Sequence, residues 1–238
     1  ITFTNIIVIL INRVMYQNIF LDIKKMKMHI WDDTKGHLEV PFRKYAYVKD
    51  GNGQHVSLYG DRLKKVTNYD KDDPTLHESD VPPTTRFLVD NYGDSDEMSV
   101  GHRIMFFDIE VEVTDGFPDV QKAQNVITSI ALYDCLTDKY FTYCFDPEKR
   151  IKSYTKDDEV VEFYDTEYEM LNKFFQKYLE IRPTIISGWN SEFFDIPYLY
   201  NRAVRILGPE VANLLSPISQ VIYSEYKKKH TIAGVSSL

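Results

Sequence analysis

The stretch RIMFFDIEVEV, residues 103–113, decides how the second half of the chain is read. Its run of Ile, Met, Phe and Val predicts a buried strand, yet Asp108 and Glu110 lie in its middle. Residues i and i+2 of a strand point to the same face, so the two carboxylates lie about 7 Å apart, while Phe107 and Ile109 take the opposite face. Carboxylates placed in this way repel each other and lose hydration when they are covered. The pattern therefore indicates a site at which a cation neutralises them.

The composition is that of a globular protein with an acidic balance. The 238 residues suffice for one large or two small domains, and 43% hydrophobic residues can form a real core. A net charge of −8 argues against a freestanding duplex-coating protein, which usually has a basic surface. An enzyme that holds a nucleic-acid end through metal ions stays open. Cys135 and Cys144 have no CxxC partner and are predicted to be buried reduced thiols.

Residues 1–14 are treated as an uncertain upstream segment. Their apolar run, Ile6–Ile11, is shorter than the about 20 residues of a membrane span and the about 7–15 residues of a signal-peptide core. No membrane association is expected. Met15 is a candidate for the true start, which would make residues 1–14 read-through or an artefact of a fragment. The alternative is that they form a genuine edge strand.

Residues 15–100 predict a small β-rich N-terminal domain of short strands and turns. The tip DGNGQ, 50–54, separates two apolar-aromatic runs and predicts a hairpin between them. The charged, proline-containing segment 67–86 is predicted to be a connecting loop. The polar stretch 90–102 is the predicted domain boundary. The expected strands are 28–33, 37–42, 45–50 and 55–60.

Residues 101–238 predict an α/β domain in which a mixed sheet is flanked by helices. Three consecutive strands are followed by a helix, a strand and a second helix. Thr166 and Glu169 form a capping-box pattern at the start of the first helix. Asp195 is predicted to be the N-cap of the second helix. The expected elements are strands 103–113, 125–134 and 139–145, helix 166–181, strand 184–189 and helix 195–207.

A second motif, SGWNSEFFDIPYLYNR (187–202), runs from the fourth strand into the second helix. If the first strand is central and the fourth lies beside it, Asp195 can approach Asp108 and Glu110 at one end of the sheet. Three carboxylates around a cavity suit Mg²⁺ or Mn²⁺, which take oxygen ligands. Two such ions can stabilise both oxygens of an in-line phosphoryl displacement. The combined pattern predicts metal-dependent phosphodiester chemistry.

The motifs FDIEVE and GWNSEFFDIPYLYNR resemble the first and second exonuclease motifs of family B DNA polymerases, with the replicative polymerases of T-even-type phages as the nearest likeness. The likeness is strong over about 103–210 and includes DGFP at 115–118. It implies a ribonuclease H-like 3′–5′ proofreading exonuclease domain with two metal ions.

The resemblance also implies roles for individual residues. Asp108 and Glu110 would hold the catalytic metals, and Asp195 would ligate the second ion. Asn190 would orient the site, and Phe194 would contact DNA. Phe117 would stack on the frayed primer end, although plain turn packing is an equal alternative for it. The implied partners are a single-stranded DNA primer end, the remainder of a polymerase chain and, through the full enzyme, a sliding clamp, in the cytoplasm of an infected bacterial host.

One departure from the family pattern sets the main alternative. The third exonuclease motif, a Tyr followed by a metal-binding Asp, is not found, and the end of the chain, 220–238, resembles the hairpin between the second and third motifs. The expectation is therefore a polymerase fragment whose exonuclease domain is incomplete at its C-terminus. The alternative function is a catalytically incomplete DNA- or partner-binding module of a split polymerase.

Several residues near the motifs receive structural rather than functional interpretations. Trp189 and Tyr198 are expected in the core, and His102 and His230 on the surface. The run YKKKH, 226–230, is expected to be a solvated turn, with a DNA backbone contact as the alternative.

Overall fold

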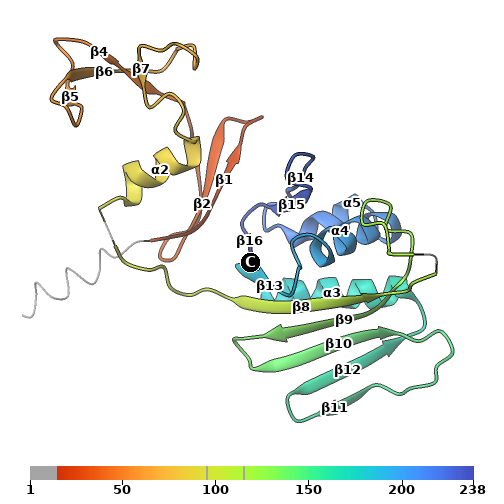
Figure 1. Ribbon diagram of the computed structural model, residues 1–238. Coiled ribbons are helices and arrows are strands. Elements are labelled where there is room, and N and C mark those ends of the chain that lie inside the picture. Colours follow the sequence, from red (N-terminus) through yellow and green to blue (C-terminus); the bar gives the residue numbers. More distant parts are fainter. Residues whose placement is uncertain (1–14, 95, 115) are drawn as a thin grey trace, which may run out of the picture. The chain divides into compact units, whose positions relative to one another are not determined.

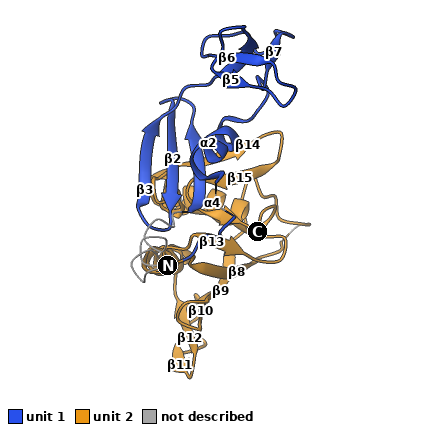
Figure 2. Ribbon diagram, turned by 90° about the vertical axis from the view of Figure 1, so that its left-hand side faces the viewer, with its two compact units in different colours: residues 1–100 blue, residues 101–238 orange. Residues whose placement is uncertain are grey.

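The structure is a computed structural model that describes residues 15–94, 96–114 and 116–238. The expectations for residues 1–14, and for Asp115 in the DGFP segment, lie outside the described residues. The chain divides into two compact units, residues 1–100 and 101–238, which are coloured separately in Figure 2. No helix in the described part of the chain is long and apolar enough to cross a membrane.

The described residues of unit 1, 15–94 and 96–100, form two antiparallel sheets and helix α2. The first sheet has the order β1-β2-β3, and the second has the order β5-β6-β4-β7. Met28 and Ile30 of β2 are buried and pack with Phe87 and Tyr92 of the helix. The elements are β1 (Tyr16–Asp22), β2 (Lys27–Asp32), β3 (Gly36–Pro41), β4 (Ala46–Lys49), β5 (His55–Val56), β6 (Arg62–Val66), β7 (Leu76–His77) and α2 (Pro83–Tyr92).

Helix α2 corrects the sequence prediction, which assigned its residues to a loop and a boundary segment. Proline is favoured in the first turn of a helix, where its missing N–H costs nothing, and Pro83 occupies that position here. Phe87 and Tyr92 then face the sheet. The Pro82-Pro83 pair was therefore a helix start, although prolines in a charged segment suggested a loop.

The hairpin predicted around residues 50–54 is also wrong in its pairing. The turn exists, with the Gly53 N–H donating to the Asp50 carbonyl at 2.8 Å. However, β4 pairs with β6, and β5 pairs with the other edge of β6. A Cβ on Gly53 would lie 2.3 Å from the Leu63 carbonyl oxygen, so β6 passes directly against the turn. A later strand separates the two that the local signal joined.

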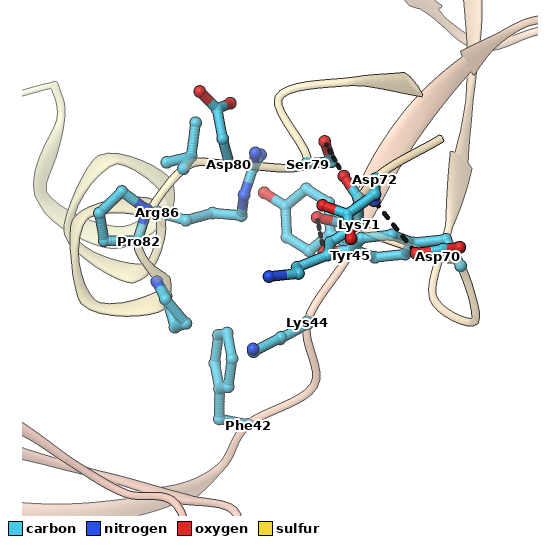
Figure 3. Close-up of a pocket in the computed structure, with 13 residues that line it drawn as sticks. Phe42, Lys44, Tyr45, Asp70, Lys71, Asp72, Ser79, Asp80, Pro82 and Arg86 are labelled. Atoms are coloured by element: carbon cyan, nitrogen blue, oxygen red, sulfur yellow. Dashed lines mark hydrogen bonds between the residues drawn. The ribbon is translucent and has the colours of Figure 1, made fainter. Parts of the chain in front are cut away.

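A pocket of about 710 Å³ opens in unit 1 (Figure 3). Tyr45 and Arg86 lie on its wall, and the Arg86 guanidinium is 4.3 Å from the centre of the Tyr45 ring. The same guanidinium is paired with Glu78 at 2.9 Å. No residue predicted to belong to the functional site lines this pocket.

Unit 2, residues 101–238, is a mixed α/β unit built on a seven-stranded sheet of order β11-β12-β10-β9-β8-β13-β16 (Figure 1). β8 pairs antiparallel with β9 and parallel with β13. It is therefore an interior strand, which meets the condition for Asp195 to approach Asp108 and Glu110. The strands are β8 (Ile104–Val111), β9 (Ile127–Asp134), β10 (Lys139–Phe145), β11 (Tyr154–Lys156), β12 (Glu159–Tyr164), β13 (Ile185–Ser187), β14 (Val221–Ser224), β15 (Lys229–Ile232) and β16 (Ser236–Ser237).

The helices of unit 2 cover one face of the sheet. Helix α3 packs on β9, β10 and β12, and α4 contacts β8. The capping box that opens α3 is confirmed, because the Thr166 hydroxyl accepts a hydrogen bond from the Glu169 N–H at 3.2 Å. The helices are α3 (Glu167–Ile181), α4 (Asp195–Ile206) and α5 (Pro209–Ala212), followed by the 3-10 turn η1 (Asn213–Leu215).

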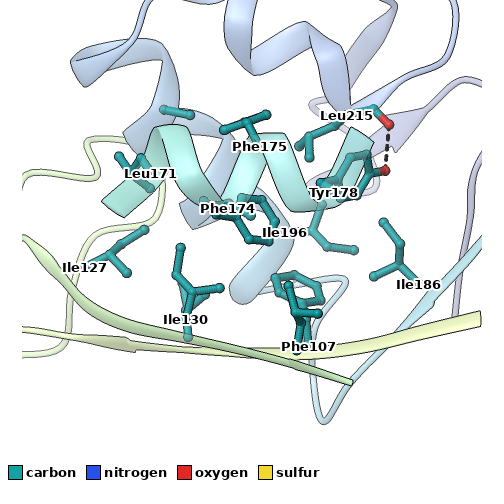
Figure 4. Packing of buried hydrophobic residues seen from close by; sticks show 14 of the residues in the cluster. Phe107, Ile127, Ile130, Leu171, Phe174, Phe175, Tyr178, Ile186, Ile196 and Leu215 are labelled. Atoms are coloured by element: carbon teal, nitrogen blue, oxygen red, sulfur yellow. Dashed lines mark hydrogen bonds between the residues drawn. The ribbon is translucent and has the colours of Figure 1, made fainter. Parts of the chain in front are cut away.

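The main core lies between the sheet and α3 (Figure 4). Phe107, Ile127 and Ile130 point from the strands toward Phe174 of α3, which is fully buried. Each such side chain gains roughly 1.5–3 kcal/mol on burial. This core fixes β8 in register, because a slip of one residue would exchange its two faces.

Strands β11 and β12 were missed by the sequence prediction, which assigned only three strands before α3. β12 pairs parallel with β10, and β11 folds back on β12 about a charged tip. Asp157 at that tip has a φ of 52°. The Asp- and Glu-rich surroundings of this hairpin masked the apolar alternation of the second strand.

Two further expectations are corrected in unit 2. Cys135 and Cys144 are both free thiols, but Cys135 is exposed and Cys144 only partly buried. His230 is 5% exposed rather than on the surface, because the rings of Tyr200 and Tyr223 pack against it. Burial lowers the pKa of His230 to about 4.

Candidate active site

Asp108 and Glu110 lie on the uncovered face of β8. Both side chains are exposed, whereas Phe107 and Ile109 beside them are each 5% exposed on the core side. The alternation predicted from the sequence is therefore present. The cross-strand neighbours of the two carboxylates are Ala131 and Ser129, which are small. The two acids therefore have short neighbours on β9.

Asp195 enters the same place from α4. It is 3% exposed, and its Oδ1 accepts a hydrogen bond from the backbone N–H of Ile109 at 3.1 Å. Asp195 is the first residue of α4, and Phe194 occupies the N-cap position without a side-chain cap. The predicted N-cap role is thus wrong, because the carboxylate reaches across to β8 instead of closing its own helix.

Asp195 is influenced electrostatically by both acids of β8. Burial, the largest influence, raises the pKa of Asp195 to about 6, and the charges on Asp108 and Glu110 act in the same direction. The hydrogen bond from Ile109 opposes this rise without cancelling it. A buried carboxylate that faces two others is unfavourable at neutral pH unless a positive charge is added.

Within the described residues, no Lys, Arg or His forms an ion pair with Asp108, Glu110 or Asp195. The donor chemistry, three carboxylates without a cationic partner, fits a hard divalent ion. As placed in the described part of the chain, however, no three His, Cys, Asp or Glu side chains are close enough together to hold a metal ion. The acids are therefore adjacent but do not form a closed set of ligands.

The loop of residues 188–194 carries the second motif between β13 and α4. A Cβ on Gly188 would lie 2.4 Å from the Phe107 carbonyl oxygen, so only glycine allows the loop to pass this close to β8. Asn190 is exposed and has a φ of 56°, a left-handed conformation that asparagine tolerates. Its carbonyl accepts the N–H of Phe194 at 3.1 Å. This turn delivers Asp195 to the start of α4.

Phe117 and Phe194 are brought together by two separate loops. Their ring centres are 5.2 Å apart with an interplanar angle of 54°, and Phe194 lies 5.6 Å from the buried ring of Tyr198. Phe117 is 82% exposed. It is therefore held against one aromatic neighbour while most of its surface remains accessible.

Two exposed aromatic residues in the same loop were not predicted as site residues. Trp189, which was expected in the core, is 93% exposed, and Phe193 is 55% exposed. Tyr198 is fully buried, as predicted. The available signal for Trp189 was its place between Gly188 and Asn190, because a residue in a turn rarely points into a core.

Comparison with known proteins identifies relatives of this chain. The family described as DNA polymerase family B, exonuclease domain, matches residues 94–236. The DNA-directed DNA polymerase of Escherichia phage RB69 is 32% identical over 165 residues, which cover 57% of this chain and 18% of that protein. That of Enterobacteria phage T4 is 32% identical over 157 residues, covering 54% and 18%.

A cellular relative shows a similar match. DNA polymerase 1 of Saccharolobus solfataricus is 32% identical over 145 residues, which cover 56% of this chain and 16% of that protein. The matched part thus spans less than a fifth of the length of each of these three relatives.

Proposed function

The chain belongs to the exonuclease-domain family of family B DNA polymerases, and we propose that it removes nucleotides from the 3′ end of single-stranded DNA, as the proofreading part of a DNA-directed DNA polymerase. Its relatives are DNA-directed DNA polymerases, which supports its classification as an enzyme. In this proposal residues 101–238 are a ribonuclease H-like exonuclease domain, and residues 15–100 are a separate small domain.

The observation that carries this proposal is the meeting of carboxylates from two distant segments beside Ile109. Asp195 binds the backbone of β8 between Asp108 and Glu110, and its pKa responds to both of them. A buried ion pair would have served stability equally well, but no described cation is paired with these acids. An acidic site of this kind favours chemistry on a phosphate group through added cations.

The proposed cofactors are two Mg²⁺ or Mn²⁺ ions, which Asp108, Glu110 and Asp195 would hold. Carboxylate oxygens are the ligands that these ions prefer. When bound, such a pair supplies charge stabilisation for the attacking and leaving oxygens of an in-line displacement. The chain's own contribution is a set of acids held on β8 and α4, two elements anchored in the core.

The remaining site residues are proposed to bind and orient the strand end. Phe117 presents an exposed ring on which a terminal base can stack, a contact worth roughly 1–3 kcal/mol per base. Phe194 supports that ring from behind. Asn190, exposed at the tip of the turn, offers an amide that can donate to the strand and accept from it.

The second candidate is a DNA- or partner-binding module with little hydrolysis of its own. It is favoured by one observation, namely that no three described His, Cys, Asp or Glu side chains lie close enough together to hold a metal ion. In this case further ligands would come from the remainder of a polymerase. The wider setting stays part of the proposal: a polymerase chain that contacts a sliding clamp in the cytoplasm of an infected bacterium.

The deciding experiment follows the shortening of a 5′-labelled single-stranded oligonucleotide with Mg²⁺ or Mn²⁺. The protein is compared with its Asp108→Ala/Glu110→Ala double variant and with Glu112→Ala. Glu112 is a matched control, because it is an exposed acid just beyond the end of the same strand. We expect loss of at least about 1,000-fold in the double variant, because the acids act on the reacting group. The Glu112 variant should stay within about twofold of the parent.

The result also separates the two candidates. Hydrolysis that depends on metal but survives in the double variant would reject the assigned site. Binding of the oligonucleotide without hydrolysis, followed by hydrolysis once the remainder of a family B polymerase is added, would favour the second candidate.

A further inference from the structure

A three-residue brace fastens the site loop to the C-terminal part of unit 2. Glu192 lies in the loop 188–194, and both of its carboxylate oxygens are 3.0 Å from the Nζ of Lys229 on β15. Ser237 of β16 donates its hydroxyl to Oε1 of Glu192 at 2.7 Å. One side chain thus joins the loop to two separate strands.

The brace is not an ordinary surface ion pair. The side chains of Glu192 and Lys229 are 23% and 26% exposed, whereas the Lys228–Glu225 pair on the same hairpin is 70% and 82% exposed. Partial burial reduces screening by water, so the inner pair is stronger than a typical exposed pair. Lys229 is therefore not part of a solvated turn, although its neighbour Lys228 is.

The brace lies at the part of the loop that carries the proposed strand-binding residues. Glu192 stands between Asn190 and Phe194, the two loop residues proposed to contact the strand end. The hydrogen bonds from the N–H groups of Phe193 and Phe194 to the Asn190 carbonyl shape the turn internally but do not attach it to another element. Lys229 and Ser237 supply that attachment at the middle of the loop.

We propose that Glu192 is a positioning residue of the exonuclease site, which acts through Lys229 and Ser237 to hold the loop so that Asn190 and Phe194 face the strand end. This inference rests on the proposed function. Asp195 has its own anchor on Ile109. Loss of the brace should therefore weaken strand binding more than it slows the chemical step.

The test uses the full chain and the variants Glu192→Gln, Lys229→Met and Lys229→Arg. The first two break the ion pair, and the third keeps the positive charge and its donors. Lys228→Met is the matched control on the same hairpin, because it removes an exposed pair that does not touch the loop. Thermal unfolding of each variant separates a local effect from a global one.

Two readouts are measured. The first is KM and kcat on a single-stranded oligonucleotide, for which Glu192→Gln and Lys229→Met should raise KM about 10-fold and change kcat by less than about threefold. The second is the fluorescence anisotropy of Trp189, beside Asn190, in a Trp31→Phe background, since the chain has two tryptophans. Anisotropy should fall in the two breaking variants and stay at the parent value in Lys229→Arg and Lys228→Met.

The two readouts also distinguish failure of this inference from failure of the proposed function. Unchanged Trp189 anisotropy and unchanged KM in Glu192→Gln and Lys229→Met would overturn the positioning role. Equal changes in Lys228→Met would do the same. If the parent protein has no hydrolytic activity, the dissociation constant of a fluorescein-labelled single strand replaces KM, and anisotropy still decides whether the brace holds the loop.

Discussion

Two buried carboxylates, Glu167 at the start of α3 and Asp195 at the start of α4, have opposite surroundings. Glu167 is 8% exposed, and Arg202 of α4 pairs with it through hydrogen bonds of 2.8 and 2.5 Å. Glu167 also accepts the N–H of Ile127 at 2.9 Å. Asp195 at the helix start is 3% exposed, but it receives one strand N–H and faces two further acids.

The difference teaches which of the two carboxylates belongs to the framework and which to a site. The Glu167–Arg202 pair supplies its own countercharge, and Arg202 also donates to the Ala123 and Gln124 carbonyls at 3.1 and 2.7 Å. It therefore joins α4 and α3 to the segment before β9. At Asp195 no cation among the described residues supplies a countercharge. The resulting repulsion is what the proposed cation site would relieve.

The strongest test of the framework role is Arg202→Met. Removal of one partner leaves the Glu167 charge buried and unpaired, so the free energy of unfolding should fall by about 3–5 kcal/mol. Denaturant unfolding measures this loss. The Glu167→Gln/Arg202→Met double variant should recover part of it, and a double variant as unstable as the single one would contradict the explanation by unpaired charge.

His230 is a third buried titratable group, and its burial favours the neutral form of the ring. Its pKa is lowered by burial to about 4, below the usual value of 6.5. The unfolded chain therefore binds the proton first as pH falls, and stability present above pH 6.5 is lost progressively toward pH 4. The loss should approach about 3 kcal/mol, at 1.36 kcal/mol per pKa unit.

The measurement for His230 is the difference between the parent and His230→Phe in free energy of unfolding at pH 7.5 and pH 4.5. Taking this difference removes the contributions of carboxyl groups that titrate in the same range. A difference that does not change with pH would show that His230 is not buried as a neutral ring.

Asp195→Asn should raise the free energy of unfolding, whereas Arg202→Met should lower it. The amide oxygen can still accept the Ile109 N–H, while the like-charge repulsion disappears, so stability at pH 7 should rise by about 1–2 kcal/mol. Hydrolysis should be lost in the same variant. Thermal unfolding with and without Mg²⁺ measures the change in stability. A destabilised Asn variant would show that repulsion among the three acids does not lower the stability of the parent protein.

Thr166→Ala tests the framework around Glu167 and should have the smallest effect on the free energy of unfolding. It removes the hydroxyl that accepts the Glu169 N–H, one residue before Glu167, and should cost about 1 kcal/mol. Denaturant unfolding should show this value, with Thr166→Ser near the parent. A loss as large as that of Arg202→Met would mean that the cap, rather than the ion pair, fixes the start of α3.

The sequence correctly predicted features that depend only on residues close together in the chain. The alternation around Asp108 and the capping box at Thr166 are of this kind, and both are present. The approach of Asp195 to β8 was conditional on β8 being central with β13 beside it, and the sheet has that order. The local alternation places Asp108 and Glu110 on one face of β8, whereas the approach of Asp195 depends on a contact between distant segments.

The failures arose where a distant partner decides the outcome. Strand β6 separates β4 from β5 although the turn between them is correctly formed. Asp195 was expected to cap its own helix, but its carboxylate instead accepts a hydrogen bond from the N–H of Ile109 in a distant segment. Trp189 was placed in the core by its residue type, and the turn that exposes it is set by the close approach of Gly188 to β8.

The bond between Asp195 and Ile109 also has a consequence for the edge of the sheet. β13 pairs with β8 only as far as Phe106, so beyond that point β8 would present unpaired backbone groups to any passing strand. Asp195 occupies this gap with a carboxylate, which takes the Ile109 donor and leaves a negative charge where a neighbouring strand would have to enter. The residue proposed to serve the site thus also opposes intermolecular pairing of an interior strand.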